Sequence, residues 1–127
     1  MIKSTELKHI ALSYKSKKEA DIFFNKILGI NLQKSFTLEK KLADKIFNKN
    51  EDVSVLVYSN ECSYFEIFIS DVISNNVYEH ICIKVKSKKE LINNCKKYKI
   101  KPFYVKKGEK NLLFVRDFSN NLFEIIE

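Results

Sequence analysis

An internal repeat is the feature that most constrains how this chain can fold. The segment HICIKVKSKKE at residues 80–90 matches HIALSYKSKKE at residues 9–19 at seven of eleven positions. Each copy opens with one of the chain's two histidines, His9 and His80. The lysines of KSKKE carry little weight in a chain so rich in lysine. A strand and a capped helix that recur in one order, with histidine in the same register, indicate a duplicated structural unit.

Both halves predict the same order of elements. Alternating apolar residues predict a first strand at 7–14 and again at 78–85. A serine with glutamate three residues later then begins a helix, over 16–28 from Ser16 and over 88–99 from Ser87. Three strands follow in each half, at about 30–36, 53–58 and 62–69, then at about 102–106, 111–116 and 121–126. The segment between 37 and 52 is compatible with a loop, a short helix or an irregular strand.

These elements predict one α+β domain over residues 1–127. Module one spans about residues 5–70 and module two about 77–127, and each is a βαβββ unit. We expect the two modules to form a curved, half-barrel mixed sheet with the helices on its outer face. The chain has one proline and two glycines, so no flexible linker divides it.

Composition narrows the functional classes. The net charge is +7, but lysine supplies nearly all the cations and Arg116 is the only arginine. Arginine is the residue that forms bidentate hydrogen bonds with phosphates and guanine edges. Because the chain has so little of it, we expect a solvated lysine surface and no nucleic-acid partner. No apolar run approaches the ~18 residues of a membrane span, and the N-terminus lacks a signal-peptide core. We therefore expect a cytoplasmic protein that does not bind membranes, with Cys62, Cys82 and Cys95 as reduced thiols.

Four side chains are candidates for chemistry. Strand alternation places His9, Glu66, His80 and Glu124 on the sheet faces turned away from the helices. Both glutamates lie in apolar strands, in the recurring motif FEI, where an unpaired carboxylate is costly. Lysine is the ordinary partner, but two glutamates in positions matching two histidines favour a metal. If the halves pair about a pseudo-twofold axis, these groups form an N2O2 set for a divalent ion.

The whole chain resembles the vicinal oxygen chelate superfamily, which includes glyoxalase I, methylmalonyl-CoA epimerase, fosfomycin-resistance thiol transferases and extradiol dioxygenases. The histidines open the strands where that family's ligands lie, and LGI at 28–30 matches its "LG" signature. DFSNNLFE at 117–124 has the spacing of the family's D-P-x-G-N-x-x-E ending. Phe118 replaces the proline and Asn120 the glycine; asparagine tolerates a left-handed backbone, so we expect the turn to persist.

Within the superfamily, the His, Glu, His, Glu set resembles that of bacterial glyoxalase I, a lactoylglutathione lyase. The resemblance implies that His9, Glu66, His80 and Glu124 hold Ni, Zn, Co or Mn, which binds the two oxygens of an enediolate. It implies that Glu124 or Glu66 moves a proton between adjacent carbons of a small-molecule substrate. It also implies a homodimer with the site at the interface or beside it.

One departure bears on the substrate. Bacterial glyoxalase I has an arginine four residues after its first ligand and an asparagine four after its second, and here these positions are Ser13 and Ser70. The sequence therefore argues against glutathione and leaves open another thiol adduct or a CoA thioester. Two alternatives stay open. One is an enzyme like methylmalonyl-CoA epimerase, which typically has glutamine where this chain has Glu66. The other is a non-catalytic binding protein of the bleomycin-resistance type.

Overall fold

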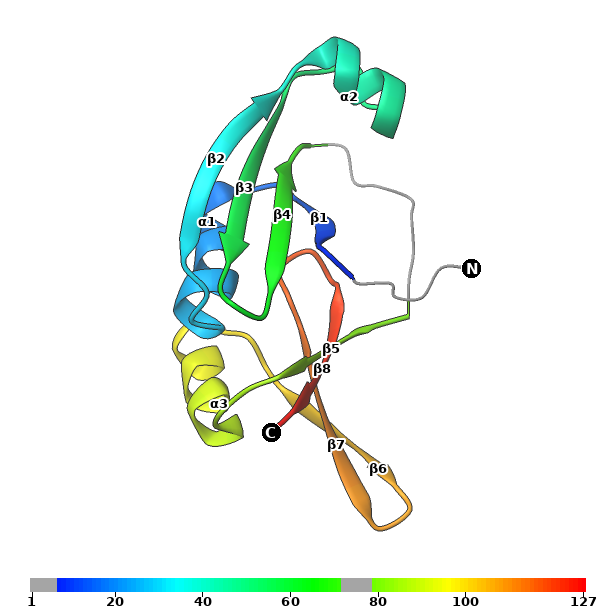
Figure 1. Cartoon of the computed structure of the whole chain (residues 1–127). Helices are drawn as coiled ribbons and strands as arrows, with labels where there is room; N and C mark the ends of the chain where they lie inside the picture. Colours follow the sequence, from blue (N-terminus) through cyan, green and yellow to red (C-terminus); the bar gives the residue numbers. More distant parts are fainter. Residues whose placement is uncertain (1–6, 72–78) are drawn as a thin grey trace, which may run out of the picture.

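Two four-stranded sheets make up the computed structural model, which describes residues 7–71 and 79–127 (Figure 1). Module one contains β1 (Ile10–Tyr14), α1 (Lys17–Asp21), η1 (Ile22–Ile27), β2 (Leu32–Leu38), α2 (Lys40–Phe47), β3 (Val53–Ser59) and β4 (Tyr64–Ile69). Module two contains β5 (Ile81–Lys84), α3 (Lys88–Lys97), β6 (Phe103–Lys107), β7 (Lys110–Arg116) and β8 (Leu122–Ile126). The segments α1, η1 and α3 cover one side of the sheets, as predicted, whereas α2 packs on the opposite face of the first sheet. The α+β class and the two tandem modules are confirmed. The predicted mixed sheet is divided between the modules as two open sheets.

Strand pairing is the same in both modules. The strand orders are β1-β4-β3-β2 and β5-β8-β7-β6. In each sheet the first strand runs parallel to the last, and the remaining pairs are antiparallel. The register repeats too, because Ala11 lies opposite Glu66 and Cys82 lies opposite Glu124. The duplication seen in the sequence is therefore a duplication of pairing geometry.

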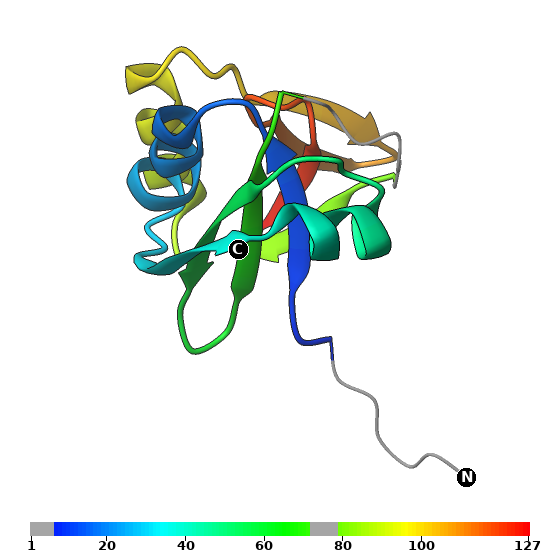
Figure 2. The ribbon, with the colours of Figure 1, turned by 90° about the horizontal axis from the view of Figure 1, so that it is seen from above.

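One hydrophobic core joins the two modules. The first helical segment buries Ala20, Phe23, Phe24 and Ile27 completely or nearly so, and α3 buries Leu91 and Cys95 in the same core. Figures 1 and 2 show α1 and α3 stacked on one side of the sheets. The side chain of Asn94 on α3 donates to the carbonyl of Ile27, 3.4 Å away. The modules are thus attached through their helix sides. No helix in the described residues is long and apolar enough to cross a membrane.

The first helix differs from the regular α-helix predicted over 16–28. Ser16 caps it as expected, accepting from the Glu19 N–H at 3.2 Å, and Ser87 caps α3 in the same way at 3.1 Å. From Ile22 the helix is π-helical, and the Leu28 N–H bonds to the carbonyl of Phe23 five residues back. The wider turn lets three large side chains face the core together: Phe23, Phe24 and Ile27.

The first strand of each module begins later than predicted. β1 starts at Ile10 and β5 at Ile81, so each histidine stands immediately before its strand. The predicted start of the second strand, residue 78, lies outside the described residues. Shifts of this size are usual at element ends, where pairing rather than sequence pattern decides the boundary.

The segment that the sequence left open forms a helix, α2. Its Ala43 packs with Val53, Val55 and Phe68 in a second, smaller core. Phe68 follows Glu66 by two residues in β4, so α2 covers the same face of the sheet that carries Glu66. Module two has no counterpart to this helix, because β6 and β7 are joined by a tight turn at Gly108.

The turn DFSNN is built around Asp117. Asn120 has a φ of 66°, the left-handed conformation expected at this position. Asp117 accepts the N–H groups of Ser119 and Asn121 at 3.0 and 2.7 Å, and the Asn121 side-chain amide at 2.8 Å. The Tyr14 hydroxyl of module one donates to the same carboxylate at 2.6 Å. Burial raises the pKa of Asp117, while these four hydrogen bonds act to lower it. The carboxylate is therefore a polar link between the modules.

Two substitutions that weaken this link should destabilise the fold to different extents. We expect Tyr14→Phe to lower the free energy of unfolding by about 1 kcal/mol, since one hydrogen bond is lost, and Asp117→Asn by about 2–3 kcal/mol. The larger loss follows because a carboxamide cannot accept all four donors. Urea unfolding monitored by circular dichroism measures both. An Asp117→Asn effect no larger than that of Tyr14→Phe contradicts the account.

Candidate metal centre

Each module places one histidine beside one glutamate. His9 Nε2 lies 3.6 Å from Glu66 Oε1, and His80 Nε2 lies 3.3 Å from Glu124 Oε1. Ala11 lies opposite Glu66 and Cys82 lies opposite Glu124, and each histidine comes two positions before one of these residues. Because side chains alternate along a strand, each histidine projects on the same face of the sheet as its glutamate. Parallel pairing of the first strand with the last thus produces the same juxtaposition twice.

The surroundings of the two pairs are also alike. The imidazoles are 47% and 42% exposed, whereas the Glu66 and Glu124 side chains are 19% and 22% exposed. An aromatic ring lies near each imidazole: Tyr64 at 5.7 Å from His9 and Phe114 at 6.4 Å from His80, between ring centroids. The carboxylates are therefore largely buried, whereas the imidazoles, each beside an aromatic ring, stay accessible.

The spacing within each pair suits shared coordination. Two ligand atoms at ~2.1 Å from one ion, subtending about 90–110°, lie roughly 3.0–3.4 Å apart. The 3.3 Å of the His80–Glu124 pair falls within this range, and the 3.6 Å of the His9–Glu66 pair lies just outside it. Imidazole nitrogen and carboxylate oxygen are ligands that Zn, Ni, Co and Mn accept. Each pair can therefore supply half of the predicted four-ligand site.

The structure does not bring the two halves together. Within residues 7–71 and 79–127, no group of three or more His, Cys, Asp or Glu side chains is placed to hold one ion. The reason is the attachment of the modules through their helix sides, which places the two ligand pairs on separate sheets. The N2O2 set expected from the sequence is thus not assembled within the described part of a single chain.

Cys82 is a side chain beside the site that the sequence did not single out. It lies opposite Glu124 in the parallel ladder and on the same face as His80. Although the residue is exposed, partial burial of the thiol and, second, the negative charge of Glu124 raise the pKa of Cys82. The alternation in HICIK was the signal that could have identified it.

The two serines that replace the glutathione-contacting residues of glyoxalase I lie together. Ser13 and Ser70 both line a cavity of about 180 Å³, next to the Asp117 turn. The Ser70 hydroxyl donates to Glu51 at 2.6 Å. Its polar atom is thus engaged within the protein.

Comparison with known proteins identifies the fold. No family model matches the sequence, and no curated protein does. Among solved structures, a glyoxalase family protein from Enterococcus faecalis matches with a TM-score of 0.70 and 19% identity, over 96% of this chain and 97% of that one. The fosfomycin resistance protein FosX from Listeria monocytogenes matches with a TM-score of 0.70 and 18% identity, over 98% and 93%. The chain has the vicinal oxygen chelate fold.

Another match is a FosX mutant from Listeria monocytogenes in complex with Mn(II) and 1S,2S-dihydroxypropylphosphonic acid. It has a TM-score of 0.69 and 20% identity, over 99% of this chain and 93% of that one. That FosX protein, which shares the fold, therefore binds a divalent metal and a small-molecule ligand. At these identities the match establishes architecture, and the ligand set of the present chain rests on its own residues.

The charge of Glu124 should be detectable through Cys82. We expect Glu124→Gln to speed alkylation of Cys82 by iodoacetamide at neutral pH about two- to fivefold, because loss of the negative charge lowers the pKa of the thiol and the thiolate is the nucleophile. Glu109→Gln, which removes the same charge at an exposed turn, should leave the rate unchanged. Mass spectrometry of the labelled peptides separates Cys82 from Cys62. Equal rates in the two variants would show that Glu124 does not act on the thiol.

Proposed function

We propose that this protein is a metal-dependent lyase or isomerase of the glyoxalase I type, acting on a small thiol adduct or thioester. The observation that carries the proposal is the repeated His–Glu pair, with ligand atoms 3.6 and 3.3 Å apart at matching positions of the two modules. A passive binding protein has no reason to keep two such pairs. Burying a carboxylate without a partner is costly, and a divalent cation shared by both pairs would compensate two carboxylates at once.

The proposed site is completed by a second copy of the chain. His9 and Glu66 of one copy would combine with His80 and Glu124 of the other, and twofold symmetry would create two equal sites. This arrangement accounts for two half-sites that stay apart in the described residues of one chain. It also keeps the helix-side attachment of the modules intact, because the carboxylate-bearing faces remain available to a partner.

The carboxylates have the chemistry that the reaction needs. A bound divalent ion supplies Lewis acidity toward a substrate oxygen. An oxygen of Glu124 or Glu66 accepts the proton from the carbon beside the carbonyl and returns it to the adjacent carbon, so that no oxidant or reductant is consumed. The partial burial of both glutamates limits the access of competing water. The aromatic rings beside the imidazoles, Tyr64 and Phe114, help to hold the histidine orientation.

A mixing experiment tests the shared site. The wild-type protein, purified without chelator and supplied with Mn, Co, Ni or Zn, should bind about one ion per chain, and His9→Ala or His80→Ala alone should bind none tightly. When the two variants are mixed and allowed to exchange subunits, half of the dimers carry both variants, and each of these has one intact site. Elemental analysis should then recover about a quarter of the wild-type metal content.

Each outcome of the mixing experiment is informative. A site within one chain predicts no recovery on mixing, because every chain lacks one ligand. Mixing His9→Ala with Glu66→Gln, both altered in module one, is the matched control and should recover nothing. If the wild-type protein binds no divalent metal under any supplementation, the metal-site proposal fails.

Isotope exchange tests the reaction. With metal present, we expect deuterium from solvent to enter the carbon beside the carbonyl of at least one substrate in a panel of hemithioacetals and methylmalonyl-CoA. Glu124→Gln should lower the rate by about 100-fold or more if Glu124 is the base, while the change Glu109→Gln at an exposed turn should not. If Glu66→Gln alone has this effect, Glu66 is the base.

The same panel separates the alternatives. Exchange with methylmalonyl-CoA alone would assign the epimerase activity. Fosfomycin belongs in the panel because FosX structures share the fold, and its consumption would replace the glyoxalase I type with that activity. Metal binding with neither exchange nor fosfomycin consumption would favour the non-catalytic binding protein.

A further inference from the structure

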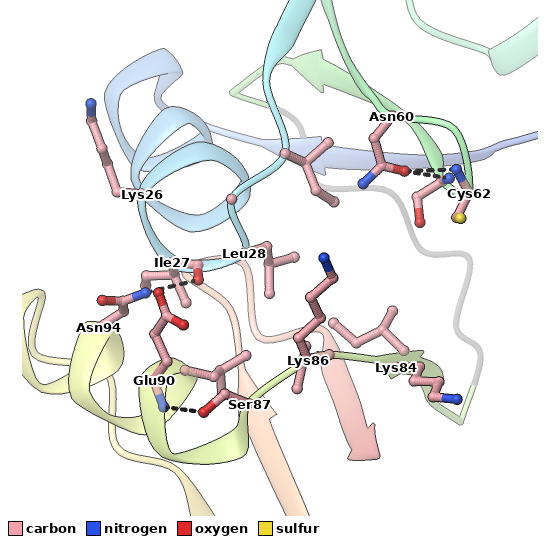
Figure 3. Close-up of a pocket in the computed structure, with 16 residues that line it drawn as sticks. Lys26, Ile27, Leu28, Asn60, Cys62, Lys84, Lys86, Ser87, Glu90 and Asn94 are labelled. Atoms are coloured by element: carbon pink, nitrogen blue, oxygen red, sulfur yellow. Dashed lines mark hydrogen bonds between the residues drawn. The ribbon is translucent and has the colours of Figure 1, made fainter. Parts of the chain in front are cut away.

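A cavity of about 630 Å³ lies between the two modules, apart from the candidate metal ligands (Figure 3). Module one contributes the end of η1 through Ile30, together with Asn60, Cys62 and Ser63 of the β3–β4 turn. Module two contributes residues 83–87 and the first turns of α3. None of His9, Glu66, His80 and Glu124 lines it. A volume of this size falls within the roughly 300–1,000 Å³ typical of small-molecule sites.

Apolar side chains form much of the cavity wall. Ile83 and Val85 project from the end of β5 toward the helices, on the opposite face from His80. They face apolar residues from η1, the segment after it and α3, and the apolar lining as a whole consists of Ile27, Leu28, Ile30, Ile83, Val85 and Leu91. This wall can accommodate the hydrocarbon part of a ligand and gain about 25 cal/mol for each Å² that it covers.

Two hydrogen-bond donors converge on this space. The Asn60 side-chain oxygen accepts the backbone N–H groups of Cys62 and Ser63 at 2.9 and 2.8 Å. These two bonds fix the orientation of the amide, so its NH₂ group points the other way, into the cavity (Figure 3). The ammonium group of Lys86 is directed into the same space. Within the described residues, neither the Asn60 NH₂ group nor the Lys86 ammonium has an acceptor.

The charge around the cavity favours an anion. Three lysines line it, Lys26, Lys84 and Lys86, against a single carboxylate, Glu90. Figure 3 shows the Lys26 and Lys84 side chains directed away from the space that the Lys86 ammonium enters, so the attraction for an anion comes mainly from Lys86. Figure 3 shows Glu90 at the α3 end, beside Asn94, and Lys86 on the side facing Asn60. A negatively charged group placed between Lys86 and Asn60 would therefore receive a charge-assisted hydrogen bond and a neutral one.

We propose that the junction cavity binds an amphipathic anion, with a carboxylate or phosphate between Lys86 and Asn60 and an apolar chain against the Ile83–Val85 wall. This second site is independent of the proposed metal centre, because the two share no residue. A ligand held there contacts both modules, so it stabilises the arrangement that carries the two ligand pairs. Binding only the folded chain, it raises the unfolding temperature with concentration.

Titration of the isotope-labelled full chain, followed by amide resonances, tests the proposal with octanoate, octyl phosphate and octanol as probes. We expect saturable shifts with octanoate or octyl phosphate at Leu28, Ser63 and Val85, and binding of octanol about tenfold weaker because the charge is absent. The tighter of the two anions identifies the head group. Equal binding of octanol and both anions, or shifts confined to another surface such as that around Phe103, overturns the proposal.

Three variants locate the anion. Lys86→Gln should weaken binding of the better anion about tenfold and leave octanol binding unchanged. Lys89→Gln removes the same charge from an α3 residue outside the cavity lining and should have no effect. Asn60→Asp keeps the oxygen that accepts Cys62 and Ser63 but replaces the NH₂ donor with negative charge, and should weaken the anion at least as much as Lys86→Gln. Equal effects of Lys86→Gln and Lys89→Gln would show that only general charge is involved.

Discussion

Parallel pairing of the first strand with the last in each module is the constraint on which both the sheets and the candidate site depend. It brings residues about 57 and 44 positions apart, His9 with Glu66 and His80 with Glu124, to within 3.6 and 3.3 Å. A parallel ladder needs a long crossover, and the helix together with the two intervening strands provides it. The crossover also covers the other face of the sheet. One pairing therefore determines where the core lies and where the polar side chains are exposed.

The sequence was most informative where periodicity and capping act locally. Both serine caps, the buried stripe of the first helix and the assignment of His9 and Glu66 to the face opposite α1, η1 and α3 are confirmed. The left-handed Asn120 was predictable for the same reason, because a turn of fixed length requires a particular backbone conformation. These features depend on a few neighbouring residues or on strand alternation, so one sequence suffices to predict them.

Features that depend on distant packing were not predictable. The π-helical turn arises from the need to bury Phe23 and Phe24 together against residues of both modules, and no local pattern marks it. The helix α2 forms where the sequence left three alternatives, because Ala43 finds a second small core on the sheet. The separation of the two ligand pairs follows from how the helix sides of the modules pack. Alternation along a strand predicts which face of its own sheet a side chain occupies. It does not predict which part of the other module that face lies against.

The two sheet faces that carry Glu66 and Glu124 have similar His–Glu pairs but differ in the surface next to each pair. On module one, α2 covers Phe68 beyond Glu66; on module two no helix intervenes, and three apolar side chains stay about half exposed: Phe103 at 40%, Val105 at 44% and Ile126 at 43%. Apolar surface beside Glu124 matches a hydrocarbon or acyl group better than a charged peptide. Arg116 lies on this face, but its guanidinium donates to the Asn120 carbonyl at 3.1 Å, and one arginine can clamp only one of the two carboxylates of glutathione. The exposed apolar face and the serines at 13 and 70 therefore argue, through separate physical effects, against glutathione as the thiol part of the substrate.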